Sequence, residues 1–79
     1  MEMVSMKLKI EYCAKWNYEP RAVSLTEKIL STGKQRINSL ELVPFNDGRF
    51  EIYKNGKKLY SKLETREFPN ESMIVKMIF

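Results

Sequence analysis

Residues 7–22 read KLKIEYCAKWNYEPRA, and this stretch decides which fold the chain can adopt. In its first half, apolar side chains alternate with Lys7, Lys9 and Glu11, which is the period-two pattern of a strand with one buried face. Pro20 suits the first turn of a helix, where the missing N–H costs little and φ is already set. The stretch therefore predicts a strand, a tight loop and a helix that begins beside the proline.

Cys13, the only cysteine, lies between the end of the predicted strand and the start of the predicted helix. Unpaired backbone N–H groups and the helix dipole favour an anion such as a thiolate at this position. One interpretation is a nucleophilic thiolate in an exposed loop, with Lys15 two residues away. The other is a small buried side chain at a strand end, which is common for free cysteines. A redox dithiol has the spacing Cys-x-x-Cys, and the fourth position here is Trp16.

The stretch resembles the selenoprotein W-like (Rdx) family, a branch of the thioredoxin-like folds that carries Cys-x-x-Cys or Cys-x-x-selenocysteine after its first strand. The matching residues around the loop are Tyr12-Cys13, Tyr18 and Pro20-Arg21-Ala22. Later matches, in the family's order, are Gly48-Arg49-Phe50-Glu51-Ile52, Gly56-Lys57-Lys58-Leu59-Tyr60-Ser61-Lys62 and Phe68-Pro69. They span nearly the whole chain. At the family's second redox position, Trp16 replaces the expected thiol or selenol.

Periodicity predicts the remaining elements. Apolar residues recur at helical spacing until Gly33, so a helix is expected at about residues 19–32. The other expected strands run from Ile37 to Val43, from about Phe50 to Tyr53, and from Lys57 to about Leu63, with a type I′ turn at Asn55-Gly56. A polar loop from Glu64 to Pro69 should precede a final helix that Asn70 caps. Residues 1–5 are expected to form a frayed leader.

Every predicted strand alternates, so helices should cover only one face of the sheet. The expected fold is β-α-β-β-β-α, an α/β (α+β) arrangement with one mixed four-stranded sheet and both helices on one face. This agrees with the thioredoxin-like fold that the resemblance implies, and residues 1–79 should form a single domain. The residues expected in the core are Leu8, Ile10, Ala22, Leu25, Ile29, Leu40, Leu42, Phe50, Ile52, Leu59, Ile74 and Ile78. Those expected on the open face are Lys7, Lys9, Glu11, Glu51, Tyr53, Lys58, Tyr60 and Lys62.

The turn-rich segment from Pro44 to Gly48 has two possible courses. It can close a plain hairpin, or it can cross the end of the first strand so that the third strand pairs on the other side. Skipping one strand spans ~10 Å, and five extended residues reach ~16 Å, so the crossing is feasible. The resemblance implies the crossing, which would place Asp47, Gly48 and Arg49 beside Cys13.

The composition excludes several classes of function. The absence of histidine excludes Ser-His and Cys-His nucleophiles and histidine-built metal sites, and we expect no metal. A single cysteine fits a reducing cytoplasm. No apolar run is long enough to cross a bilayer and no signal-peptide pattern is present, so we expect no membrane association. The net charge of +4 is spread over scattered lysines, which is typical of a solvated surface. Oligomeric state is not predicted.

The resemblance implies a thiol-dependent redox or redox-sensing role through Cys13, and the chain would then resemble a monothiol thiol–disulfide oxidoreductase. A lone thiol can form a mixed disulfide with glutathione, another low-molecular-weight thiol or a partner protein, and an external thiol must resolve it. Apart from such a co-substrate, no cofactor is expected. The loop neighbours of Cys13 that a partner would meet are Ala14, Lys15, Trp16 and Tyr18.

Two alternatives remain open. The first is a redox-inactive protein-interaction module on the same scaffold, in which Trp16 forms an apolar contact for a partner. The second is nucleic-acid binding through the open sheet face, where Tyr53 and Tyr60 would stack on bases and lysines would neutralise phosphates. The sequence contains no recognisable nucleic-acid motif, which disfavours the second alternative.

Overall fold

The structure is a computed structural model that describes residues 5–79, so most of the expected leader lies outside the described residues. Four strands form one mixed sheet in the order β2-β1-β3-β4, with β1 parallel to β2 and antiparallel to β3. The strands are β1 (Lys7–Cys13), β2 (Ser39–Phe45), β3 (Phe50–Lys54) and β4 (Lys57–Ser61). The helices are α1 (Glu19–Gly33), η1 (Lys34–Arg36), α2 (Lys62–Thr65) and α3 (Glu71–Ile78). The thioredoxin-like fold and the crossing between β2 and β3 are confirmed.

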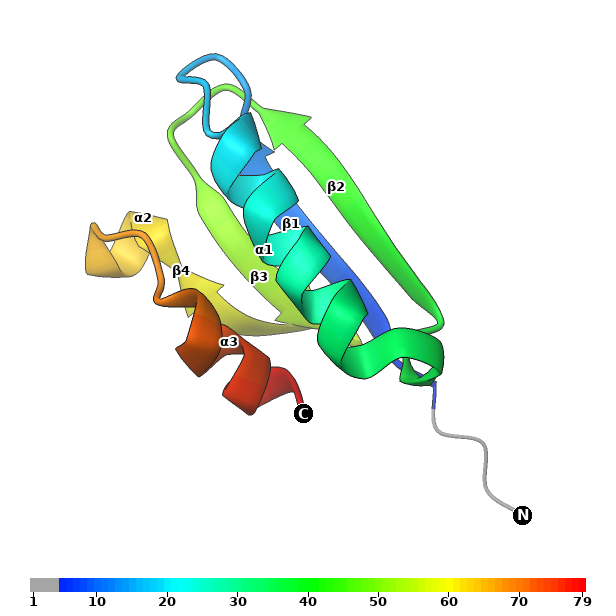
Figure 1. The fold of residues 1–79 in the computed structure, drawn as a ribbon. Coiled ribbons are helices and arrows are strands. Elements are labelled where there is room, and N and C mark those ends of the chain that lie inside the picture. Colours follow the sequence, from blue (N-terminus) through cyan, green and yellow to red (C-terminus); the bar gives the residue numbers. More distant parts are fainter. Residues whose placement is uncertain (1–4) are drawn as a thin grey trace.

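The two long helices pack on the same face of the sheet, as the sequence predicted. Figure 1 shows α1 running along β1 with α3 beside it, while α2 lies at the end of β4. Their buried residues form one cluster with the sheet: Met6, Leu8, Ile10, Ala22, Leu25, Ile29, Phe50, Ile52, Ile74 and Ile78. Nine of the twelve residues predicted for the core belong to this cluster. This apolar layer holds the two helices to the strands.

The three remaining residues predicted for the core are less buried because their strands, β2 and β4, are the edges of the sheet. Leu42 is 38% exposed, so its assignment to the core is wrong, and Leu40 is only half-buried. Both residues belong to β2, which is an edge strand, and a strand outside the helical layer has less to pack against. Leu59 is half-buried and packs against the cluster from β4, the opposite edge.

β2 begins at Ser39 and ends at Phe45, two residues later at each end than the predicted strand, so it includes Pro44 and Phe45. Proline lacks the N–H that a central strand needs, and for this reason the sequence predicts Pro44 in the connection rather than in the strand. Here the Phe45 carbonyl accepts from the Ala14 N–H at 2.9 Å, so Phe45 faces β1 and the preceding residue faces the free edge. An edge strand tolerates proline at such an outward position.

The end of β4 also differs from the prediction. The strand stops at Ser61, and the next four residues form α2 rather than a strand end and a loop. The Ser61 side chain accepts a hydrogen bond from the Glu64 N–H at 3.1 Å, so it caps this helix. Ser-x-x-Glu is the capping-box spacing, and it was the overlooked signal in the sequence.

An irregularity in the β3–β4 ladder places Tyr60 on the helix-covered face. The register shifts between Ile52 and Tyr53, so that Tyr53 pairs with Lys58 while Ile52 pairs with Tyr60. Leu59 is the extra residue of this bulge. Tyr60 therefore packs against the core, and the expectation that it shares the open face with Tyr53 is wrong.

Candidate functional site

Cys13 is the last residue of β1, and the crossing between β2 and β3 passes directly beside it. The Cys13 N–H donates to the Arg49 carbonyl at 2.9 Å, and the next N–H donates to the Phe45 carbonyl at 2.9 Å. These two bonds hold the end of β1 between the end of β2 and the start of β3. Figure 1 shows the two loops together at one end of the sheet. The structure thus brings together Cys13 and the predicted facing loop of Asp47, Gly48 and Arg49.

The loop after Cys13 folds back onto the cysteine. The Trp16 N–H donates to the Cys13 Sγ at 3.3 Å, and the Tyr18 N–H donates to the Cys13 carbonyl at 3.0 Å. Asn17 has a φ of 61°, a left-handed conformation that asparagine adopts more readily than most residues. The turn therefore places a backbone donor against the sulfur.

The Cys13 side chain is fully buried, at 0% exposure. The loop residues Ala14, Lys15, Trp16 and Asn17 are exposed, as the first interpretation expected, but the thiol itself is buried, as the second interpretation expected. The returning turn contacts the Cys13 sulfur through the Trp16 N–H, and the crossing loop is bonded to the Cys13 backbone through the Arg49 carbonyl. The reactivity of Cys13 in the folded protein depends on movement of these two segments.

The Trp16 side chain is 59% exposed and lies over Gly48 of the crossing loop. A Cβ built on Gly48 would approach the indole Cζ3 to 2.9 Å, and Gly48 has a φ of 83°. Glycine is required here for both reasons, because a side chain would clash with the indole and would be strained in the left-handed region. The indole thus links the two loops that surround Cys13.

Arg49 holds the crossing loop in place through charge. It donates to Glu11 Oε1 at 2.7 Å and to Asp47 Oδ2 at 2.8 Å, and its guanidinium lies 3.8 Å above the Phe45 ring. The hydrogen bonds from Arg49 lower the pKa of Asp47, and bonds to Asp47 and Glu11 raise the pKa of Arg49. The guanidinium therefore stays charged and ties β1 to the loop beside Cys13.

The open face of the sheet buries two carboxylates that the sequence had placed on a solvated surface. Glu51 is only 1% exposed, and Glu11 is also buried. Burial opposes ionisation of Glu11, but bonds from Arg49 and Lys9 outweigh it, so its pKa is lowered. Burial likewise opposes ionisation of Glu51, whose pKa is lowered by Ser61, the Leu63 N–H and Lys58.

This pairing bears on the nucleic-acid alternative. Lys9 lies 3.2 Å from Glu11 Oε2, Lys58 lies 3.4 Å from Glu51 Oε1, and both amines also lie over the Tyr53 ring. Cations that already neutralise buried carboxylates are poor partners for phosphate, and only one of the two predicted tyrosines is on this face. The geometry therefore disfavours nucleic-acid binding here.

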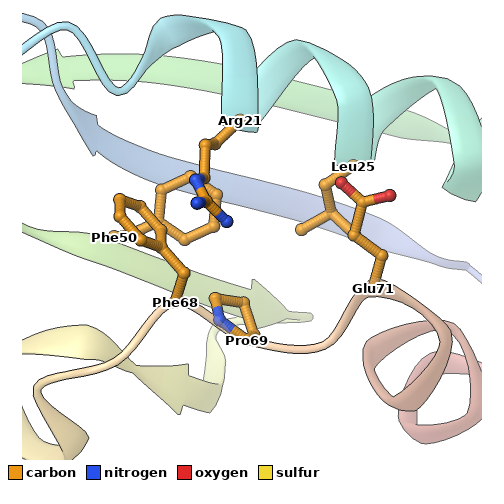
Figure 2. A pocket seen from close by; sticks show the side chains of 6 residues that line it. All are labelled: Arg21, Leu25, Phe50, Phe68, Pro69 and Glu71. Carbon is orange, nitrogen blue, oxygen red and sulfur yellow. The ribbon is translucent and has the colours of Figure 1, made fainter.

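Tyr18 connects the loop to the helical layer through a chain of aromatic contacts. Its ring meets Phe68 edge to face at 4.7 Å between centroids, and Phe68 meets Phe50 at 5.4 Å. Figure 2 shows Arg21 extending from α1 over Phe68, 4.1 Å from the guanidinium carbon to the ring. The hollow between these groups has a volume of about 10 Å³, room for one water and not for a substrate.

Within residues 5–79, no group of three acidic or cysteine side chains could hold a metal ion. No helix in the described part of the chain is long and apolar enough to span a membrane. The functional residue that sequence reasoning missed is Glu11, which lies 38 positions from its partner Arg49. No local pattern could have revealed that pairing.

The Rdx family model matches residues 7–78, nearly the whole described chain. The chain belongs to the Rdx family. Among solved structures, a selenoprotein W-related protein from Vibrio cholerae has 27% sequence identity and a TM-score of 0.90, over 95% of this chain and 94% of that one. A protein from Bordetella parapertussis has 27% identity and a TM-score of 0.85, over 90% of each chain. No curated protein matches the sequence.

Membership of the Rdx family confirms the family resemblance, and with it a thioredoxin-like, redox-associated type of protein. In this structure Cys13 ends β1 directly before the loop, and Trp16 supplies a backbone donor to its sulfur.

Proposed function

We propose that this Rdx protein has a thiol-dependent redox or redox-sensing function through the single thiol of Cys13, in the cytoplasm. The observation that carries the proposal is the hydrogen bond from the Trp16 N–H to the Cys13 Sγ at 3.3 Å. A donor that points at a sulfur can stabilise negative charge there, and the thiolate is the nucleophile in disulfide exchange. A merely space-filling cysteine does not need this bond.

The chemistry is a two-step exchange. The Cys13 thiol loses its proton to solvent, and its sulfur attacks a disulfide, for example oxidised glutathione. A new S–S bond forms to Cys13, the old S–S bond breaks, and one thiolate leaves. A second, external thiolate then attacks the mixed disulfide and restores Cys13, because position 16 offers no thiol. The co-substrate is therefore a low-molecular-weight thiol or a protein thiol.

Access to the sulfur requires local opening. The exposed turn at residues 14–17 folds back on the sulfur, and its Trp16 indole rests on Gly48 of the crossing loop. A short exposed turn opens at much lower free energy than the core unfolds. Displacing Trp16 from Gly48 would uncover Cys13 while β1 stays paired.

The test is the modification rate of Cys13 by oxidised glutathione and by iodoacetamide, measured by mass spectrometry over a series of urea concentrations below the unfolding transition. Local opening exposes little surface, so the rate should change little with urea. A Trp16→Ala variant should react faster than the wild type. If the rate instead follows global unfolding in both proteins, Cys13 is a packing residue and the redox proposal fails.

A second variant tests the missing thiol. The Trp16 N lies 3.3 Å from the Cys13 Sγ, so a side chain at this position starts close to the sulfur. Trp16→Cys should form an internal disulfide, which needs Cβ atoms about 3.8 Å apart, and should catalyse dithiol–disulfide exchange. Lys15→Cys is the matched control, since it adds a thiol to the same exposed loop at the wrong spacing. Equal activity in the two variants would contradict the spacing argument.

The burial of Cys13 favours a second candidate, a redox-inactive interaction module. Trp16 is the most exposed of the large hydrophobic side chains of residues 5–79. Tryptophan is enriched among residues that dominate binding energy at interfaces. If the protein is an interaction module, Cys13→Ser would preserve binding of the partner protein and Trp16→Ala would abolish it. Under the redox proposal, Cys13→Ser abolishes function.

A further inference from the structure

The Arg49 side chain connects three parts of the sheet at the end where Cys13 lies. Its Nη1 donates to Glu11 Oε1 at 2.7 Å, while Nε and Nη2 donate to Asp47 Oδ1 and Oδ2 at 3.1 and 2.8 Å. The guanidinium also lies above the Phe45 ring at the end of β2. One side chain therefore joins β1, the end of β2 and the crossing loop.

The Glu11 end of this connection is fixed in the sheet. Glu11 lies in the middle of β1, where it pairs with Val43 of β2 on one side and with Glu51 of β3 on the other. Its carboxylate is buried, and Oε1 also accepts from the Tyr53 hydroxyl at 3.3 Å. Because strands on both sides hold Glu11, it does not follow a movement of the crossing loop. Such a movement breaks the bond between Arg49 and Glu11.

The residue before Arg49 supports the Trp16 indole. Gly48 is buried, and a Cβ built on it would lie 2.9 Å from the indole Cζ3, so the ring lies directly on the backbone of the crossing loop. The Trp16 N–H donates to the Cys13 Sγ, and the Arg49 carbonyl accepts from the Cys13 N–H. The crossing loop is thus connected to the Cys13 backbone and to the residue that donates to the sulfur.

We propose that Arg49 is a positioning residue for the reaction of Cys13. Its contacts with Glu11 and Asp47 hold Gly48 beneath the Trp16 indole, and releasing them lets the turn at residues 14–17 leave the sulfur. The strength of these contacts sets the population of the open, reactive state. This inference rests on the proposed function, because it concerns how often the same thiol becomes accessible.

The forked shape of the guanidinium allows one residue to hold two carboxylates. One nitrogen serves Glu11 on β1, and two others serve Asp47 in the loop. Asp47 also accepts from the Arg49 N–H at 3.2 Å, which ties the carboxylate to the backbone of the same residue. A lysine amine would keep the charge, but as a point charge on a flexible stem it does not reproduce this geometry. The positioning therefore depends on geometry as well as on charge.

The first test is the rate at which iodoacetamide alkylates Cys13 in the folded protein without urea. Glu11→Gln should raise this rate ~10-fold, because the bond from Arg49 loses its charged acceptor. Glu51→Gln is the matched control, since it makes the same change at the buried register partner of Glu11, whose cation is Lys58. Its rate should stay within ~2-fold of the wild type, because local opening does not depend on global stability. Equal acceleration in the two variants overturns the role of Arg49.

Hydrogen exchange at the Trp16 N–H, followed by NMR, is the second measurement, because opening of the turn releases this N–H from the sulfur. In Glu11→Gln its exchange should accelerate by the same factor as alkylation. Amides of the central strand β3 should keep the exchange rates that global unfolding gives them. If Arg49 were merely structural, Glu11→Gln would accelerate exchange in β3 and at Trp16 together, and that result overturns the proposal.

Arg49→Lys separates geometry from charge, and it should also accelerate alkylation of Cys13 and exchange at the Trp16 N–H. The inference and the proposed function fail on different results. If alkylation of the wild type follows global unfolding over the urea series, the redox proposal fails, and the role of Arg49 fails with it. If the wild type reacts through local opening but neither Glu11→Gln nor Arg49→Lys accelerates it, only the role of Arg49 is overturned.

Discussion

The central strands β1 and β3 bury side chains on both faces, by apolar packing on one face and by ion pairing on the other. Ile10 and Ile52 are register partners on one face and are buried beneath the helices by apolar packing. Glu11 and Glu51 are register partners on the other face and are also buried, although α1 and α3 lie on the opposite side. There the cover consists of long cationic side chains whose stems shield the sheet and whose charges pair with the carboxylates. A sheet face without helices can therefore bury acids.

The comparison separates what holds the fold from what positions the site. The apolar face determines whether the domain folds, because it contains the main cluster. The ionic face anchors Arg49, whose carbonyl accepts from the Cys13 N–H. Substitutions on the apolar face should unfold the chain. Substitutions on the ionic face around Arg49 should loosen the surroundings of Cys13 with a smaller loss of free energy of unfolding.

The largest effect is expected on the apolar face. Phe50→Ala should lower the free energy of unfolding by ~3–5 kcal/mol, because it removes a fully buried ring and leaves a cavity. Urea denaturation followed by circular dichroism measures this. Leu63→Ala, which truncates an exposed side chain, should cost less than ~0.5 kcal/mol. A Phe50→Ala protein as stable as the control would contradict the position of this ring in the core.

On the ionic face, Glu51→Gln should cost ~1–3 kcal/mol, because the amide keeps a similar shape but leaves Lys58 without its buried carboxylate. The matched control is Glu64→Gln. Glu64 contacts the same amine at 3.9 Å from a side chain that is mostly exposed, so its loss should be nearly neutral. Similar losses in the two variants would show that burial of Glu51 is not what gives this ion pair its strength.

Acid should weaken the ionic face selectively. The folded-state pKa of Glu11 lies below its ordinary value of 4.5, so around that pH the unfolded chain binds more protons than the folded chain. Stability is therefore fully present above the unfolded pKa and is lost as the pH falls through the folded one. Melting temperatures from pH 7 to pH 3 should decline less steeply for Glu11→Gln than for the wild type. Parallel declines would contradict a contribution from Glu11.

The smallest effect is expected for Lys9→Met, which removes the more exposed partner of Glu11 and leaves the Arg49 contact intact. Exposed ion pairs contribute ~0–1 kcal/mol, and the apolar stem is retained. Adding 0.5 M salt should therefore change the stability of the wild type and of Lys9→Met by similar small amounts. If Lys9→Met lowered the free energy of unfolding as much as Glu51→Gln, Lys9 rather than Arg49 would be the main partner of Glu11.

Much of the fold could be predicted because the signals are local. Alternation along residues 6–12 gave β1, and Asn55-Gly56 gave a turn whose two residues have φ values of 52° and 82°, as a type I′ hairpin requires. The faces of β4 could not be read in the same way, because the bulge inserts Leu59 and moves Tyr60 to the core side. Alternation predicts faces only while the ladder is regular.

The candidate site was predicted in its residues but not in its accessibility. Family resemblance brought Cys13 and the crossing loop together, and the structure places them in hydrogen-bonding contact. It did not indicate that the sulfur is fully enclosed, or that Trp16 rests on Gly48. These features depend on two loops that are some 30 residues apart in the sequence and meet only after the sheet forms.

By itself, the sequence determined most of the elements, the turn at Asn55-Gly56 and the single thiol, because each depends on neighbouring residues or on composition alone. Tertiary structure decided which apolar residues stay exposed, as at Leu42, and which carboxylates become buried, as at Glu51. The physical reason is that burial is a property of the assembled neighbourhood. A leucine on an edge strand lacks the cover that helices give to the same residue on a central one, and an acid can be buried where distant cations reach it.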